Sequence, residues 1–334
     1  MKQGIGIAIV GRAMARGEQA PVPDTLRDER PADPSWRADA LRQSPHRRLA
    51  DEIAAPRAAT AKEAEEVCRR INRAVLRDFA PALLLLRPED RRRLRALTAW
   101  TVTLFDLANQ QGLAGERLAA VNRWEFELEQ ALSGRPSPQP IFIELAREAR
   151  QVPWDAKDFA RLTGLARDRI VDAEPATGEA AAEASRRLAT ALVQCFVAHP
   201  GPALLDLAEG LVRVRQLQDL AVNLRRGAST PATAGKPWQQ DPEPPRHELE
   251  QAVLHECGCA RSLLMGGARG VQEMPAELRA AALWLVYAGL ALVTDIEDDP
   301  RSAMSQPTHL GAVRRIGLLL RARWTARRLR WRHR

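Results

Sequence analysis

Apolar residues recur at helical spacing through most of this chain, and short breaks rich in Gly or Pro interrupt them. In the segment 94–107, for example, Leu94, Leu97, Leu104 and Leu107 can share one helix face. No alternation of apolar and polar residues lasts long enough to indicate a strand. The pattern predicts an all-α protein with helices at 62–78, 89–110, 115–133, 139–150, 156–165, 177–198, 202–226, 246–266, 275–297 and 307–331.

The first part of the chain lacks this periodicity. Residues 1–58 are rich in Pro, Arg, Asp and Ala, a composition typical of disordered segments. We therefore expect a disordered leader over 1–58 and one helical domain over 59–334. Within that domain, the Pro-rich segment 228–245 predicts a loop directly after the helix that ends at 226.

Composition narrows the classes of protein that this sequence can represent. Of its 334 residues, 45% are hydrophobic, which is enough to build a sizeable core. The net charge of +8 favours an anionic partner: a substrate, a membrane surface or a nucleic acid. The four cysteines show no disulfide framework, which indicates a cytoplasmic protein. No run approaches the roughly 18 apolar residues of a transmembrane helix.

The segment 216–227 carries the most distinctive candidate chemistry. Asp219 and Asn223 are four residues apart on a predicted helix, so both side chains face the same way. Oxygen ligands so placed can hold Mg²⁺ against a diphosphate. Arg225 and Arg226 follow, and guanidinium groups bind phosphate in a bidentate fork. A structural alternative remains open, because arginines at a helix C-terminus also stabilise the helix dipole.

Two segments resemble the squalene/phytoene synthase family, the head-to-head prenyl-diphosphate synthases. Residues 79–109, which contain Pro88-Glu-Asp-Arg91, resemble the family helix that ends in its first Asp-rich motif. Residues 216–227 resemble the helix with the second motif. Weaker matches at 164–168, 275–279 and 287–301 occur in the same order as in the family. The likeness covers roughly residues 60–325.

The resemblance implies a single large helical bundle of the isoprenoid-synthase type that encloses a central apolar cavity. It also implies a Mg²⁺-dependent transferase that ionises farnesyl or geranylgeranyl diphosphate. Carried over by position, Asp219 and Asn223 are catalytic and metal-binding, with Asp106 and Asn109 as further metal ligands. Phe79 and Phe105 would line the cavity. Arg215 stands where the family has Asn and, with Arg225 and Arg226, would bind the diphosphate.

Several positions depart from the family pattern. Phe105 and Asn223 replace aspartates, Asp78 replaces a serine, and Gln218 replaces an arginine. Each Asp-to-Asn change removes a charge and keeps an oxygen, so the metal site would be weaker. Two hypotheses follow: a divergent prenyltransferase, or a catalytically inactive homologue that acts as an assembly factor or as the partner of an active synthase.

The end of the chain predicts a surface role. Residues 314–332 combine many arginines with Trp324 and Trp331 on a predicted helix. A basic amphipathic helix with tryptophan is typical of proteins that lie on an anionic membrane surface. We therefore expect a cytoplasmic protein that can be peripheral to the inner face of the membrane. No nucleic-acid-binding fold accompanies residues 314–332, so nucleic-acid binding is not expected.

Overall fold

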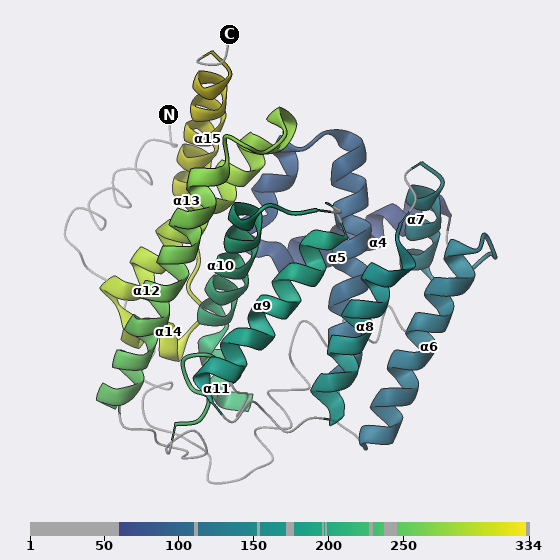
Figure 1. Cartoon of the computed structure of the whole chain (residues 1–334), viewed down its shortest axis with the longest axis horizontal. Coiled ribbons are helices and arrows are strands. Elements are labelled where there is room, and N and C mark those ends of the chain that lie inside the picture. Colours follow the sequence, from purple (N-terminus) through teal and green to yellow (C-terminus); the bar gives the residue numbers. More distant parts are fainter. Residues whose placement is uncertain are drawn as a thin grey trace, which may run out of the picture. The chain divides into compact units, whose positions relative to one another are not determined.

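The structure, a computed structural model, has helices where the sequence carries helix-forming signals (Figure 1). It describes residues 60–331 except 110–112, 152–153, 172–176, 196, 198, 227–229 and 237–245. The leader expected over 1–58 lies outside the described residues. In the described part the chain is helical and contains no strand, which confirms the all-α prediction. The helices are α4 (Ala61–Leu76), η2 (Arg77–Leu85), α5 (Pro88–Ala108), α6 (Ala114–Leu132), α7 (Pro140–Ala149), α8 (Ala156–Val171), α9 (Gly178–Gln194), α10 (Pro202–Gln218), α11 (Leu220–Arg226), α12 (Arg246–Gly270), α13 (Ala276–Asp298), α14 (Pro300–Ser305) and α15 (Ala312–Trp331).

Local chemistry explains where several helices begin. At the start of α4, Thr60 and Glu63 form a reciprocal capping box: Glu63 N donates to Thr60 Oγ1, and Thr60 N donates to Glu63 Oε2 at 2.7 Å. Pro88 opens α5, where a missing N–H costs nothing. Such signals lie within a few residues of each helix, which is why the sequence predicts them.

The structure corrects the predicted helices at three places. A 3₁₀ helix, η2, follows α4, and Pro81 within it prevents an ordinary α-helix. The predicted helix 202–226 is divided at Asp219 into α10 and α11. The predicted helix 307–331 begins only at Ala312, after the separate short helix α14.

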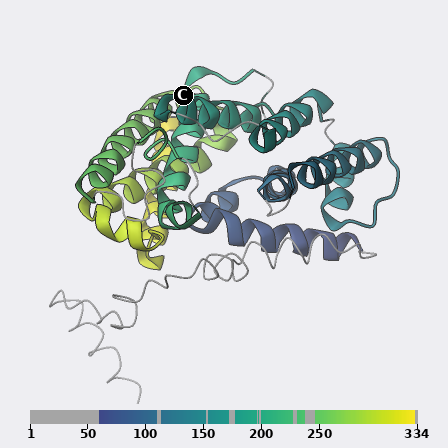
Figure 2. The ribbon, with the colours of Figure 1, turned by 90° about the horizontal axis from the view of Figure 1, so that it is seen from below.

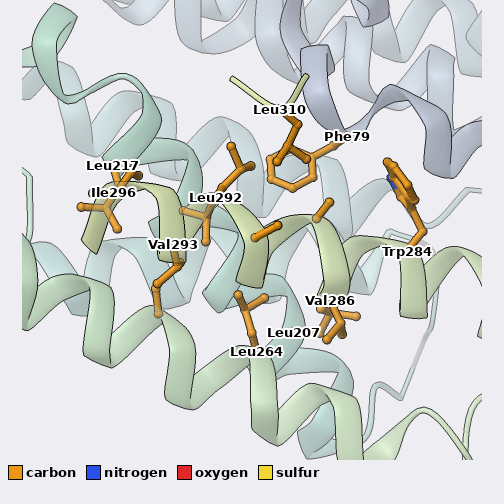
Figure 3. Packing of buried hydrophobic residues seen from close by; sticks show 14 of the residues in the cluster. Phe79, Leu207, Leu217, Leu264, Trp284, Val286, Leu292, Val293, Ile296 and Leu310 are labelled. Carbon is orange, nitrogen blue, oxygen red and sulfur yellow. The ribbon is translucent and has the colours of Figure 1, made fainter. Parts of the chain in front are cut away.

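Two hydrophobic clusters form the core of the described part. The first lies among α4 to α9 and contains Trp100, whose ring meets Phe159 edge-on at 4.9 Å between centroids. The second joins η2, α10, α12, α13 and α15 around Trp284 and Leu292 (Figure 3). In Figure 2, the green and yellow helices of the second cluster group apart from the purple and blue helices of the first. Leu76 of α4 packs against the second cluster, whereas Val67 and Val75 of the same helix pack against the first.

Helix α13 is the centre of the second cluster. It is the one described helix that is long and apolar enough to cross a membrane by length and composition, contrary to the expectation that no run comes close. Of its most apolar window, 56% is buried within the protein. Val286, Leu292, Val293 and Ile296 pack inside the cluster, so the apolarity of α13 has a structural explanation (Figure 3).

Helices α10 and α12 pack closely against each other, because glycines of α12 face α10. A Cβ added to Gly267 would lie 2.7 Å from Leu207 Cβ and 2.9 Å from Leu207 Cα. At Gly270 an added Cβ would lie 1.9 Å from Ala203 Cβ. The backbone of α12 therefore rests directly on α10, and this contact fixes the helix that leads to Asp219.

Candidate functional site

Asp219 stands at the break between α10 and α11. Its backbone (φ −91°, ψ 10°) leaves the helical region, although Asp219 N still donates to Arg215 O at 3.0 Å. Asn223 N in turn donates to Asp219 O at 2.8 Å. The two side chains that the sequence places one turn apart thus remain one turn apart, across a bend rather than within one straight helix. Both residues are half-buried.

Two arginines converge on the Asp219 carboxylate. Arg215, one turn earlier on α10, places Nη2 2.9 Å from Asp219 Oδ2. Arg77, at the start of η2, places Nη1 3.8 Å from Asp219 Oδ1. All three side chains keep about a quarter of their surface exposed, so a ligand can reach them. The structure thus joins Asp219 to the predicted phosphate ligand Arg215 and adds Arg77, which sequence reasoning missed.

Arg77 adopts an unusual backbone conformation for a residue with a side chain. Its φ is +42°, and it is the one described non-glycine residue with positive φ. Such conformations cost of order 1–3 kcal/mol and concentrate at binding and catalytic sites. The only signal in the sequence was position, since Arg77 immediately precedes the Asp78-Phe79 pair that resembles a family motif.

The guanidinium group of Arg215 is largely shielded from water. Desolvation lowers its pKa, with the like charge of Arg77 acting in the same direction and Asp219 opposing it. An arginine remains charged at neutral pH even so. Its Nη1 is buried and has no hydrogen-bond partner in the described part of the protein. A charged N–H group without a partner is costly, and an anionic oxygen would satisfy it.

Asp78 lies beside this pair of arginines and is almost fully buried. Its Oδ2 accepts a 3.0 Å hydrogen bond from Gln218 Nε2 and lies 2.9 Å from His309 Nδ1. Its Oδ1 accepts a 3.2 Å bond from Leu310 N and lies 4.0 Å from Arg315 Nη1. These contacts tie η2, α10 and the segment before α15 together beneath the arginines. Asp78 and Gln218, two departures from the family pattern, are therefore partners.

The other predicted metal ligands lie at the C-terminal end of α5. Asp106 is half-buried, and Asn109 is exposed at the C-cap. Phe105 packs against the first hydrophobic cluster, whereas Phe79 is buried in the second. The prediction that both phenylalanines line one cavity stays a prediction. Arg225 and Arg226 form the last turn of α11, and their side chains lie outside the described residues.

The donor set does not fit a cluster of metal ions. Across the described residues, no group of three or more His, Cys, Asp or Glu side chains is placed to hold a metal. The carboxylate of Asp219 is already paired with two guanidinium groups, and that of Asp78 is buried and bound by Gln218 and Leu310. Arrangements of this kind attract an anion more strongly than a cation. The magnesium prediction thus gains no support from geometry and stays untested.

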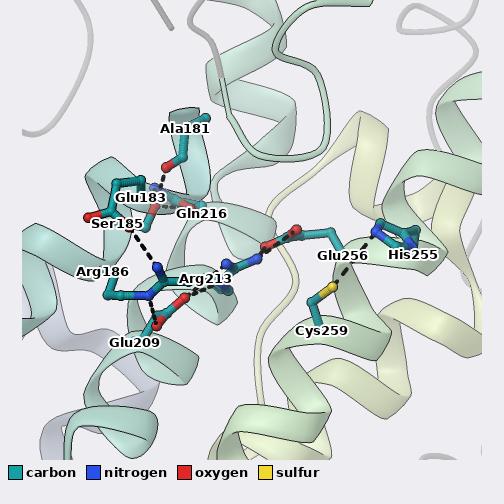
Figure 4. A network of polar contacts seen from close by, with 10 residues as sticks. All are labelled: Ala181, Glu183, Ser185, Arg186, Glu209, Arg213, Gln216, His255, Glu256 and Cys259. Atoms are coloured by element: carbon teal, nitrogen blue, oxygen red, sulfur yellow. Dashed lines mark hydrogen bonds and ion pairs between the residues drawn. The ribbon is translucent and has the colours of Figure 1, made fainter. Parts of the chain in front are cut away.

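A second polar cluster, which sequence reasoning missed, supports α10 from its other side (Figure 4). Arg213 is buried between two buried carboxylates. It donates to Glu209 Oε1 at 2.8 Å and 3.1 Å, and to both Glu256 oxygens at 3.0 Å and 3.1 Å. Burial raises the pKa of Glu256, and Arg213 opposes that shift. Because every member is paired, we interpret this cluster as structural: it fixes α10 against α12.

Comparison with solved structures identifies the fold. A dehydrosqualene synthase in complex with ligand superposes with a TM-score of 0.65 and 13% identity, covering 80% of this chain and 98% of that one. The protein has the fold of the squalene and dehydrosqualene synthases. The squalene synthase HpnC from Alicyclobacillus acidocaldarius gives a TM-score of 0.53 and 19% identity, over 74% of this chain and 97% of its own.

The likeness is one of structure rather than sequence. No family model and no curated protein sequence matches the chain. The squalene-synthase fold therefore confirms the resemblance that the ordered motifs predicted, including the isoprenoid-synthase type of helical bundle. Activity does not follow from fold alone, so the function has to be argued from the residues around Asp219.

Proposed function

We propose that the protein binds a prenyl diphosphate, farnesyl or geranylgeranyl diphosphate, with its diphosphate at Arg215 and Arg77. The observation that carries the proposal is the buried Nη1 of Arg215, which has no partner among the described residues. A phosphate oxygen that displaced the atoms now covering this donor would satisfy it, while the rest of the guanidinium keeps its contact with Asp219. The sequence resemblance implies the same role for Arg225 and Arg226.

The fold supplies the reason for a prenyl ligand. Two of the solved structures that the chain resembles are named as a dehydrosqualene synthase and a squalene synthase. Within this class we propose a divergent prenyltransferase, in which the diphosphate leaves with the electrons of its C–O bond. The double bond of a second prenyl chain then attacks the allylic cation, and the coupled product loses a proton. The leaving group carries about three negative charges, which arginines are suited to stabilise.

A second candidate has its own supporting observation. The carboxylate of Asp219 is paired with two arginines, and Asn223 and Phe105 lack the charges that a metal-dependent ionisation uses. An inactive homologue that binds a prenyl diphosphate, and that serves as an assembly factor or as the partner of an active synthase, fits this arrangement. The two candidates share the anion site and differ in whether the C–O bond is broken.

The first experiment follows diphosphate release and organic-extractable product with farnesyl or geranylgeranyl diphosphate, with and without Mg²⁺. Release that disappears in Asp219→Ala establishes ionisation chemistry and refutes the inactive homologue, and a coupled organic-extractable product identifies the prenyltransferase. No release by a folded helical protein that still binds either substrate favours the inactive homologue. Absence of both release and binding refutes the proposed ligand class.

Direct binding tests the anion site itself. We expect Arg215→Gln to weaken binding of farnesyl diphosphate by about 10- to 100-fold without added metal, the range of a lost charge-assisted hydrogen bond. Arg123→Gln, an exposed arginine on α6, is the matched control and should bind normally. Equal affinity of Arg215→Gln and the control, in proteins with the same helical content, would place the ligand elsewhere.

Asp219→Asn separates anion binding from metal binding. If the arginines bind the diphosphate directly, loss of the competing carboxylate strengthens metal-free binding, because Arg215 and Arg77 are released. If Asp219 instead holds Mg²⁺, the same substitution weakens binding in the presence of Mg²⁺. Titrations of wild type and variant with and without the metal distinguish the two outcomes by their sign.

A further inference from the structure

Helix α15 has an apolar face that the rest of the described protein does not cover. Ala322 and Ala326 are buried against the second cluster, in which α15 packs along α13 (Figure 1). Large apolar side chains nevertheless remain exposed elsewhere on the same helix. They are Val313 (86% exposed), Ile316 (60%), Leu320 (62%) and Trp324 (55%).

These four side chains form a single stripe. At 100° per residue, the positions 313, 316, 320 and 324 fall within an arc of about 80°. Ala322 lies on the opposite side of the helix from the centre of that arc. Scattered single apolar residues are normal on a protein surface, but an aligned row of four on one helix indicates an interaction site. We call Val313, Ile316, Leu320 and Trp324 the α15 stripe.

Arginines border the α15 stripe on both sides. By the same spacing, Arg323 lies along one edge and Arg321 and Arg328 lie along the other, while Arg327 continues the line of the stripe one turn beyond Trp324. The guanidinium of Arg328 stacks over the Trp324 ring at 3.4 Å. Helix α15 contains seven arginines and no acidic residue. The surface is therefore apolar along its middle and positively charged along its edges.

We propose that the α15 stripe inserts into the interface of an anionic membrane, with the bordering arginines on lipid phosphates. A helix with an apolar face, cationic borders and an interfacial tryptophan lies in the plane of a bilayer with its apolar side among the acyl chains. Each arginine near an anionic surface contributes favourable electrostatic energy. This interface is independent of the proposed diphosphate site, since it uses a different face and different residues.

Other occupants fit the surface less well. A second copy of this chain that used the same stripe would place the seven arginines of each α15 against those of the other, with no acidic residue on the helix to offset them. A nucleic acid would match the arginines but would leave four apolar side chains without a partner. Charge complementarity and the apolar stripe together favour lipid.

The test is flotation of the full-length protein with vesicles of phosphatidylcholine, either alone or with about 30% phosphatidylglycerol, a roughly physiological anionic content. We expect binding to the anionic vesicles that weakens as salt is raised. Leu320→Glu combined with Trp324→Glu should reduce partitioning at least tenfold. Arg323→Gln combined with Arg327→Gln should reduce it about 25-fold, near fivefold per arginine.

Helix α6 provides matched controls, because Phe126 is 56% exposed and Arg123 is exposed there. Phe126→Glu and Arg123→Gln should leave partitioning unchanged. The proposal is overturned if the wild-type protein does not float, or if the α15 variants float as well as the controls. It is also overturned if the protein is oligomeric and Leu320→Glu makes it monomeric without altering flotation, since the stripe then serves a second copy. All variants should retain wild-type diphosphate binding, so failure here leaves the proposed function standing.

Discussion

Gln218 Nε2 donates a 3.0 Å hydrogen bond to Oδ2 of Asp78, a residue 140 positions earlier in the chain. The same nitrogen donates to Thr308 O at 3.0 Å. One amide group therefore connects η2, the end of α10 and the segment that leads into α15. Because Arg77 precedes Asp78 and Asp219 follows Gln218, this bond also sets the distance between the arginine and the carboxylate of the candidate site.

We expect Asp78→Ala to lower the free energy of unfolding by about 2–4 kcal/mol, because buried donors on Gln218 and Leu310 lose their acceptor. Chemical denaturation measures the change. In a double-mutant cycle with Gln218→Ala, the coupling energy should exceed about 1 kcal/mol. Additive effects of the two substitutions would contradict a direct bond between them.

Arg213 should be far more important for stability than its neighbour Arg186, although both contact Glu209. Arg213→Met leaves Glu209 and Glu256 buried without their cation, and we expect a loss of about 3–5 kcal/mol. Arg186 is 57% exposed, with Nε 3.1 Å from Glu209 Oε2. Arg186→Met should therefore cost less than about 1 kcal/mol. Similar unfolding midpoints for the two variants would show that Arg213 is not the structural centre of the network.

The close packing of α10 against α12 can be tested by a substitution that has a control on the same helix. Gly267→Ala introduces a Cβ close to the backbone of Leu207, and we expect a loss of about 1–3 kcal/mol. Gly258 is exposed on α12, and an added Cβ there meets nothing within 4 Å. Gly258→Ala should be neutral or should stabilise by up to about 1 kcal/mol, since alanine favours helix. Thermal unfolding of both variants checks the prediction, and a stabilising Gly267→Ala would contradict the close crossing.

The buried carboxyl group of Glu144 should make the free energy of unfolding depend on pH. Burial raises the pKa of its carboxyl group to about 7, while Arg147, whose Nη2 lies 3.0 Å away, opposes the shift. In the unfolded chain the group titrates near 4.5. Between these values the folded state holds a proton that the unfolded state releases, so this group's contribution to stability falls as pH rises from about 4.5 to about 7.

Glu144→Gln should remove that dependence. We expect the variant to gain on the order of 2 kcal/mol over wild type at pH 8 and little at pH 5, measured by urea denaturation at both values. Glu129→Gln, an exposed change on α6, serves as the control. A variant that is less stable than wild type at pH 8 would show that the ion pair with Arg147 outweighs burial.

Several features of the protein followed from the sequence alone. Helix positions were predictable because apolar spacing, capping residues such as Thr60 and stops such as Gly134 act within one or two turns of the chain. The order of short motifs predicted the fold that the solved structures then confirmed. The sequence also placed Asp219, Asn223 and Arg215 together, since residues on one helix are related by its geometry alone.

Contacts between distant segments were decided only by the tertiary structure. No local pattern indicates that Arg77 pairs with Asp219, that Gln218 bonds to Asp78, or that Glu256 completes the pairing of Arg213. The sequence shows that residues 202–226 favour a helix, and packing decides that it divides at Asp219. The physical reason is the distance along the chain over which each effect acts. Periodicity and capping depend on neighbouring residues, whereas the partner of a charged side chain depends on which helices pack together. For this protein that difference separates a predicted metal ligand from a carboxylate held between two arginines.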